Sequence, residues 1–83
     1  MFLRKLLIAD PSDIFCQALI NMLGIGYEAR MCHNGYDTLE YLENFNPDIV
    51  VMDLTLSGFD GISVLKELCA RPRRPSIMVT TRF

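Results

Sequence analysis

The stretch Ile49-Val50-Val51-Met52-Asp53 sets four apolar residues directly before a carboxylate. The run is short, follows Pro47 and Asp48, and leads into a turn-rich segment, which predicts a strand buried on both faces of a sheet. Asp53 then lies at the carboxyl end of a central strand, the edge at which open α/β sheets bind ligands. A carboxylate there is a nucleophile, a metal ligand or both; the plainer alternative is a cap for the following loop.

The composition describes one small globular domain. The chain has 83 residues, of which 51% are hydrophobic and 22% charged, as expected for a chain that forms a core. Its net charge of −2 gives no reason to expect nucleic-acid binding by this segment. No run resembles a signal peptide or spans a bilayer, so we expect no membrane contact. The cysteines Cys16, Cys32 and Cys69 are widely spaced, which indicates reduced core thiols in a cytoplasmic protein.

Apolar runs and helical repeats alternate along the whole chain. Strands are predicted at residues 3–9, 27–32, 49–53 and 77–79. Helices are predicted to begin at three capping residues, Ser12 or Asp13, Asn34 and Asp60. The resulting order β-α-β-α-β-α-β over residues 1–83 predicts an α/β fold, a doubly wound parallel sheet with helices on both faces.

Each helix carries an apolar stripe that we expect to face the sheet. The stripe of the first helix comprises Ile14, Phe15, Ala18, Leu19, Met22 and Leu23. The second comprises Tyr36, Leu39, Leu42 and Phe45, and the third comprises Ile62, Leu65, Leu68 and Cys69.

Polar side chains end three of the predicted strands. Asp10 follows the first, Asp53 the third and Thr80 the fourth. Because the strands of a parallel sheet point the same way, these residues meet at one edge whatever the strand order. Two neighbouring carboxylates repel each other, and a hard divalent cation such as Mg²⁺ would relieve that repulsion and offset the charge of a phosphoryl group. The alternative for Asp10 is an isolated cap of the first helix.

Three segments of the chain resemble the receiver domain of bacterial two-component response regulators. They are residues 6–10 (LLIAD), 47–61 (PDIVVMDLTLSGFDG) and 77–80 (IMVT). The resemblance covers nearly the whole chain, and its central block is the most specific part. It implies a flavodoxin-like fold of strand order 2-1-3-4, an incomplete receiver that lacks the last helix-strand-helix.

The resemblance also implies a role for particular residues. Asp53 matches the aspartate that accepts a phosphoryl group from a histidine kinase or phosphotransfer protein. Asp10, Asp53 and the backbone carbonyl of Thr55 match the ligands of Mg²⁺. Thr80 matches the switch hydroxyl that contacts the phosphoryl group. Gly58 and Gly61 match the tight turn beside the site.

The sequence departs from the family pattern in ways that keep a second hypothesis open. Pro11 replaces the second acid of the metal-binding pair, Ser57 replaces a usual proline, and no lysine matches the one that pairs with the phosphoryl group, since Lys66 falls on the third helix. The alternative is therefore a degenerate receiver-like module that binds proteins without being phosphorylated. An enzyme of the haloacid-dehalogenase phosphatase type is disfavoured because Thr55 stands where a second acid is common.

The fourth strand is predicted to lie at the edge of the sheet. It is apolar and β-branched, and such edges pair readily with other strands. We therefore expect the 83 residues to form a homo-oligomer through this edge, or by exchanging an element, rather than a stable monomer.

Overall fold

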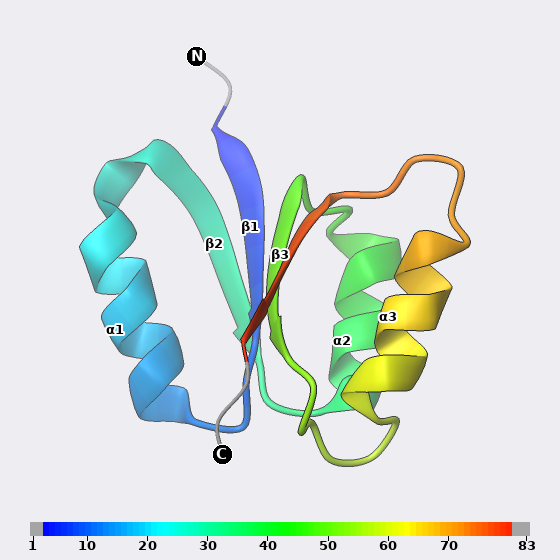
Figure 1. Cartoon of the computed structure of the whole chain (residues 1–83). Coiled ribbons are helices and arrows are strands. Elements are labelled where there is room, and N and C mark those ends of the chain that lie inside the picture. Colours follow the sequence, from blue (N-terminus) through cyan, green and yellow to red (C-terminus); the bar gives the residue numbers. More distant parts are fainter. Residues whose placement is uncertain (1–2, 81–83) are drawn as a thin grey trace.

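The computed structural model describes residues 3–80 of the chain. Its elements follow the predicted order and are drawn in Figure 1. They are β1 (Arg4–Ala9), α1 (Asp13–Leu23), a 3₁₀ turn η1 (Gly24–Gly26), β2 (Tyr27–Cys32), α2 (Gly35–Asn44), β3 (Ile49–Asp53), α3 (Gly61–Cys69) and β4 (Ser76–Thr80).

The strands form one parallel sheet of order β2-β1-β3-β4. Helix α1 covers one face, and α2 with α3 cover the other (Figure 1). The predicted doubly wound sheet and its order 2-1-3-4 are therefore confirmed. β2 and β4 are the edge strands, and β4 is the last element within residues 3–80.

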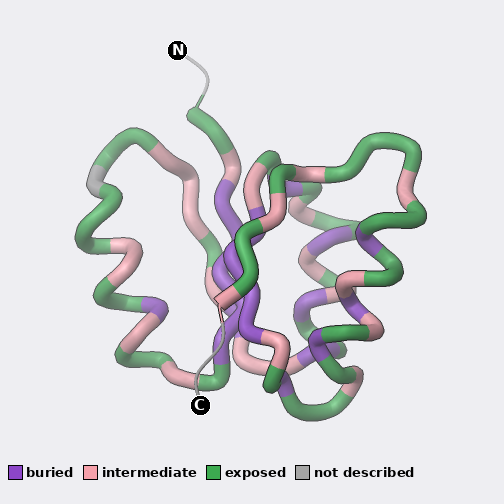
Figure 2. The backbone as a smooth tube through the Cα atoms, in the orientation of Figure 1, coloured by how far each residue is buried: buried purple, intermediate pink, exposed green. Residues whose placement is uncertain are grey.

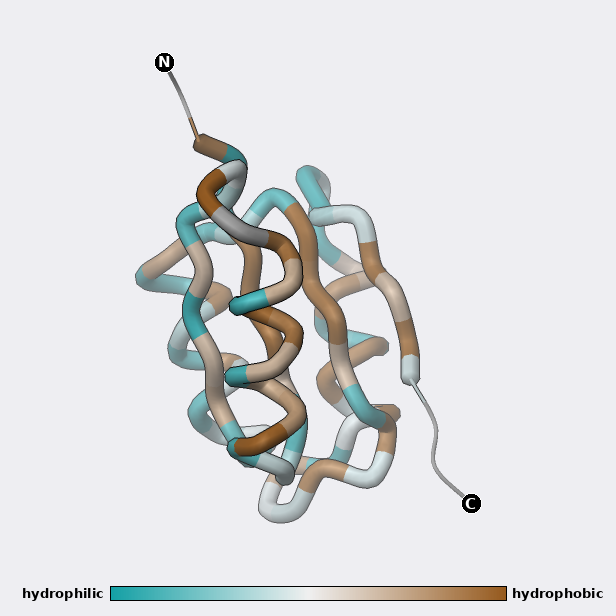
Figure 3. Tube along the Cα trace, turned by 90° about the vertical axis from the view of Figure 1, so that its left-hand side faces the viewer, coloured by the Kyte–Doolittle hydropathy of each residue, from teal (hydrophilic) through white to brown (hydrophobic). Residues whose placement is uncertain are grey.

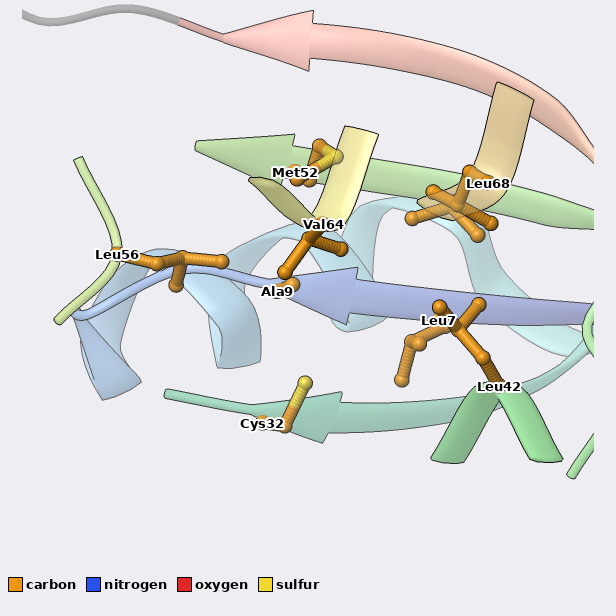
Figure 4. Close-up of a cluster of buried hydrophobic side chains, with 9 residues drawn as sticks. Leu7, Ala9, Cys32, Leu42, Met52, Leu56, Val64 and Leu68 are labelled. Atoms are coloured by element: carbon orange, nitrogen blue, oxygen red, sulfur yellow. The ribbon is translucent and has the colours of Figure 1, made fainter. Parts of the chain in front are cut away.

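The central strands β1 and β3 are buried on both faces, as their unbroken apolar runs predict (Figure 2). On β1, Leu6 and Ile8 belong to the core under α1, whereas Leu7 and Ala9 belong to the core under α2 and α3. The second core is the larger one and is drawn in Figure 4. Its buried members are Leu7, Ala9, Cys32, Leu42, Val50, Met52, Leu56, Val64 and Leu68.

Polar side chains fix where the helices begin. The Ser12 hydroxyl accepts a hydrogen bond from the Phe15 amide at 3.1 Å. The Asn34 side chain accepts one from the Asp37 amide at 2.8 Å, and Asp60 accepts one from the Ser63 amide. Each bond satisfies an amide that has no partner inside the helix, so the caps predicted from sequence set the observed boundaries.

The predicted helix faces were only partly right. In α1, Phe15 and Leu19 pack on the core with Cys16 and Ile20, but Ile14 and Met22 are 83% and 82% exposed. These outward apolar residues lie on the helix that faces the viewer in Figure 3. The other helices show the same kind of error, since Tyr36, Ile62 and Cys69 are exposed. In α3 the buried residues are Gly61, Val64 and Leu68.

The cysteine prediction holds for two of the thiols. Cys16 and Cys32 are free and buried, whereas Cys69 is free but exposed at the end of α3. Within residues 3–80 no helix has both the length and the apolar character that crossing a membrane requires.

Candidate functional site

The predicted site residues lie at the carboxyl ends of adjacent strands. Ala9 of β1 pairs with Met52 of β3, so the next residues, Asp10 and Asp53, leave neighbouring strands together. Thr80 of β4 pairs directly with Asp53 on its other side. Both carboxylates are almost fully buried, with Asp10 1% and Asp53 2% exposed. The structure thus brings these three residues to one edge of the sheet.

Asp53 is held by the residue two positions further along the chain. Its Oδ1 accepts a hydrogen bond from the Thr55 amide at 2.8 Å and a second from the Thr55 hydroxyl at 2.7 Å. The chain turns at this point because the strand ends and the aspartate side chain takes over as acceptor for the backbone. The hydroxyl contact is a site feature that the sequence prediction missed, since it used only the backbone carbonyl of Thr55.

Asp10 has a parallel arrangement at the end of β1. Its Oδ1 accepts a hydrogen bond from the Ser12 amide at 2.8 Å, across the intervening Pro11. Pro11 is exposed and has no amide hydrogen to offer. Asp10 therefore binds the backbone just before α1, whose capping hydroxyl comes from Ser12, and also places its carboxylate beside β3.

Thr80 directs its hydroxyl back onto the neighbouring strand. Its Oγ1 donates to the Met52 carbonyl oxygen at 3.3 Å. This bond holds the side chain beside the last residues of β3, where Thr80 pairs directly with Asp53.

The loop after Asp53 is fastened to the first turn of α2. The Gly35 amide donates to the Ser57 carbonyl at 2.9 Å, and Asn34 forms a parallel β-bridge with Ser57. Gly58 has a φ of 76°, a left-handed conformation that glycine adopts without strain. The ring of Tyr36 lies so close that a Cβ on Gly58 would come within 2.8 Å of it.

Gly61 begins α3 where that helix comes closest to the end of β3. A Cβ at Gly61 would lie 2.5 Å from the Leu54 Cα and 2.8 Å from the Asp53 carbonyl oxygen. Gly58 thus lies in the turn after β3, whereas Gly61 is the first residue of α3. Ser57, at the usual proline position, supplies the carbonyl that binds α2.

His33 is a further neighbour of the site. Its Nδ1 lies 2.9 Å from the Asp10 carbonyl oxygen, and its Nε2 lies 3.3 Å from the Asp13 carboxylate. The ring joins the end of β2 to the β1–α1 connection. Its side chain is 41% exposed. The signal available in the sequence was its position directly after the second strand, the same kind of position that Asp10 occupies after the first.

The donor set at this edge suits a hard cation such as Mg²⁺. Asp10 and Asp53 offer carboxylate oxygens, and oxygen ligands are those that Mg²⁺ prefers. Among the described residues no three or more His, Cys, Asp or Glu side chains form a group able to hold a metal ion. A cation here would therefore depend on two carboxylates together with backbone oxygen and water. Lys66, which does not match the lysine that pairs with the phosphoryl group in the family, is exposed on α3.

A family model matches the chain over residues 6–83, which include every residue of this site. The chain belongs to the response regulator receiver domain family. Receiver domains of this family are part of two-component signalling.

Two curated proteins are similar to this chain in sequence. One is protein-glutamate methylesterase/protein-glutamine glutaminase 3 of Rhodospirillum rubrum, 31% identical over 81 residues, which are 95% of this chain and 22% of that protein. The other is the regulatory protein AtoC of Escherichia coli, 28% identical over 82 residues, which are 98% of this chain and 18% of that protein. The chain thus spans about a fifth of the length of these relatives.

Solved receiver domains have the same fold. A CheY-like receiver domain from Methylobacillus flagellatus superposes with a TM-score of 0.86 at 24% identity, covering 99% of this chain and 72% of that one. A response regulator receiver protein from Methanoculleus marisnigri gives a TM-score of 0.79 at 27% identity, covering 96% of this chain and 66% of that one. The receiver fold expected from the three sequence segments is confirmed.

Proposed function

We propose that this receiver domain accepts a phosphoryl group on Asp53 from a histidine kinase or a phosphotransfer protein. One observation carries the proposal: Asp53 is a buried carboxylate that leaves a central strand between Asp10 and Thr80, at a single edge of the sheet. A phosphoryl acceptor needs a nucleophile, neighbouring groups that offset charge, and a donor for the transferred oxygens. In this proposal the chain acts as a phosphoryl acceptor in signalling and not as an enzyme.

The transfer itself is a displacement at phosphorus. A carboxylate oxygen of Asp53 forms the new P–O bond while the P–N bond of the donor's phosphohistidine breaks. The electron pair of that bond stays on the imidazole nitrogen, which then takes a proton from water. The product is an acyl phosphate on Asp53, and Thr80, the direct partner of Asp53 on β4, would donate its hydroxyl to a phosphoryl oxygen.

Mg²⁺ is the cofactor that this site would use. Asp10, Asp53 and the Thr55 carbonyl would hold it, and the ion would supply charge neutralisation for the incoming phosphoryl group. Pro11 cannot replace the second acid, so we expect weaker Mg²⁺ binding than a site with two consecutive acids would have.

Intact mass after incubation with acetyl phosphate tests the acceptor. We expect a Mg²⁺-dependent gain of one phosphoryl group that is lost in Asp53→Asn. Asp48→Asn is the matched control, because Asp48 precedes the same strand at the opposite edge of the sheet and is exposed. An unmodified wild-type mass, or labelling that persists in Asp53→Asn, would contradict the proposal.

The alternative is a receiver-like module that binds proteins without being phosphorylated. Two features favour it: Pro11 replaces an acid, and the Asp10 carboxylate is bound to the Ser12 amide. An unlabelled wild type that still binds a histidine kinase or phosphotransfer protein would support this alternative.

We also propose a cytoplasmic location and self-association through β4. The location rests on the free cysteines and on the signalling family. The association rests on the edge position of β4, where Met78 and Val79 are 61% and 40% exposed. A second copy would add its own strand at this edge. We propose neither nucleic acid nor a membrane as a partner of this segment.

A further inference from the structure

We propose that His33 and Asp13 form a binding site for a divalent transition-metal ion such as Zn²⁺. The site joins the residue after β2 to the first turn of α1. Its ligands are different side chains from those of the Mg²⁺ site proposed at Asp10 and Asp53. The proposal does not depend on phosphoryl transfer, because neither ligand takes part in that step.

The hydrogen bonding of the imidazole fixes which ring nitrogen is available to a metal ion. Nδ1 of His33 lies 2.9 Å from the Asp10 carbonyl oxygen, which only accepts hydrogen bonds, so Nδ1 carries a hydrogen. In the neutral ring Nε2 then has a free lone pair. Metal-binding histidines almost always have this arrangement, in which the other ring nitrogen donates to a carbonyl or carboxylate oxygen and holds the ring in place.

The second ligand lies at the separation that a tetrahedral ion requires. Nε2 of His33 is 3.3 Å from Oδ1 of Asp13. Zn²⁺ binds imidazole nitrogen and carboxylate oxygen at about 2.0 Å each, and two such ligands of a tetrahedral ion lie about 3.3 Å apart. One ion can therefore bind both atoms at the separation that they already have.

The surroundings of the pair favour a transition metal over Mg²⁺. The side chains of His33 and Asp13 are 41% and 65% exposed, so an ion can reach them and water can complete its coordination. Imidazole nitrogen is a ligand for Zn²⁺, Cu²⁺ and Ni²⁺, whereas Mg²⁺ prefers oxygen. Without a metal, the same two atoms can share a proton as an ion pair, and the metal ion must displace that proton.

Calorimetric titration with Zn²⁺ tests the site. The titrated chain carries Cys69→Ser, because the exposed Cys69 thiol would bind the ion as well. The buffer is slightly alkaline, which keeps the imidazole neutral, and contains excess Mg²⁺ to occupy sites made only of oxygen. Even an outer partner of a metal-binding histidine is worth about tenfold in affinity, so His33→Gln and Asp13→Asn should each weaken Zn²⁺ binding at least about tenfold.

Asp37→Asn is the matched control for Asp13→Asn. Asp37 is also an exposed acid in the first turn of a helix, and its variant should leave Zn²⁺ binding unchanged. His33 is the single histidine of the sequence, so its imidazole gives one set of ring-proton signals in NMR spectra. Those signals should shift when Zn²⁺ is added, and should shift much less in Asp13→Asn. The amide signals of the same spectra show that each variant is folded.

The outcomes decide the site without reference to phosphorylation of Asp53. Absence of Zn²⁺ binding, or binding that His33→Gln retains, overturns the proposal. Binding that needs His33 but not Asp13 also overturns it, because a single imidazole would then be the ligand. Equal weakening in Asp13→Asn and Asp37→Asn would assign the effect to net charge and would overturn it as well.

Discussion

At the scale of single residues, the glycines differ in what a side chain would meet. A Cβ on Gly35 would lie 1.3 Å from the Phe59 carbonyl oxygen, whereas one on Gly26 would have no atom within 4 Å. We expect Gly35→Ala to lower the free energy of unfolding by roughly 3 kcal/mol, because backbone rather than a flexible side chain must move. Gly26→Ala should stay within about 0.5 kcal/mol of wild type. Urea unfolding of both variants is the measurement, and equal midpoints would contradict the described contact.

The single residue Cys32 makes the free energy of unfolding depend on pH. Burial raises the pKa of the Cys32 thiol from 9.0 to about 11, and the Thr38 hydroxyl partly offsets the effect. The unfolded chain therefore loses this proton at a lower pH than the folded chain. The resulting stability is fully present below pH 9 and is lost as the pH rises toward 11. Urea unfolding between pH 7 and pH 10 should show this loss in wild type and a shallower one in Cys32→Ala; identical slopes would refute it.

At the scale of elements, α2 depends on its cap and on its contact with the loop after Asp53. The Asn34 side chain accepts from the Asp37 amide, while the backbone of Asn34 forms the bridge to Ser57. Asn34→Ala should therefore cost about 1 kcal/mol of stability through the lost cap alone. Asn34→Ser supplies another capping oxygen and should recover most of this loss. Thermal unfolding compares the three proteins, and a serine variant no better than alanine would argue against the cap.

The elements themselves were predictable, but the faces of the helices were not. The apolar runs of β1 and β3 and the caps Asn34 and Asp60 identified strands and helix starts, because both signals are local. In α1 the apolar residues extend around more than half of the helix. Periodicity alone could not decide that Cys16 and Ile20 face the sheet while Ile14 does not, because the docking angle of the helix sets that choice.

The candidate site was predictable to the same extent. The meeting of Asp10, Asp53 and Thr80 follows from parallel topology, and the structure has it. The hydroxyl bond from Thr55 and the contact of His33 with the Asp10 carbonyl depend on side-chain rotamers and loop paths. Those are tertiary features, which spacing in a sequence does not determine.

At the scale of the whole molecule, the β4 edge is where we expect two copies to meet. A lysine at Met78 should oppose this pairing, because a charge on an edge strand discourages strand addition. Met22→Lys is the matched control, since Met22 is 82% exposed on α1 and lies outside the sheet. Sedimentation should give a dimer mass for wild type and Met22→Lys, and a lower mass for Met78→Lys. A monomeric wild type, or dissociation by Met22→Lys instead, would contradict the β4 interface.

The bridge between Asn34 and Ser57 affects the entropic cost of binding a partner at the loop after Asp53. A flexible loop loses conformational entropy when a partner orders it, and that loss weakens binding. Here the Gly35 amide and the Asn34 backbone already hold the loop that follows Asp53. The phosphoryl donor that we propose for Asp53 would then meet a loop that these backbone contacts already hold. Ordering of this loop should then contribute little to the entropic cost of binding that donor.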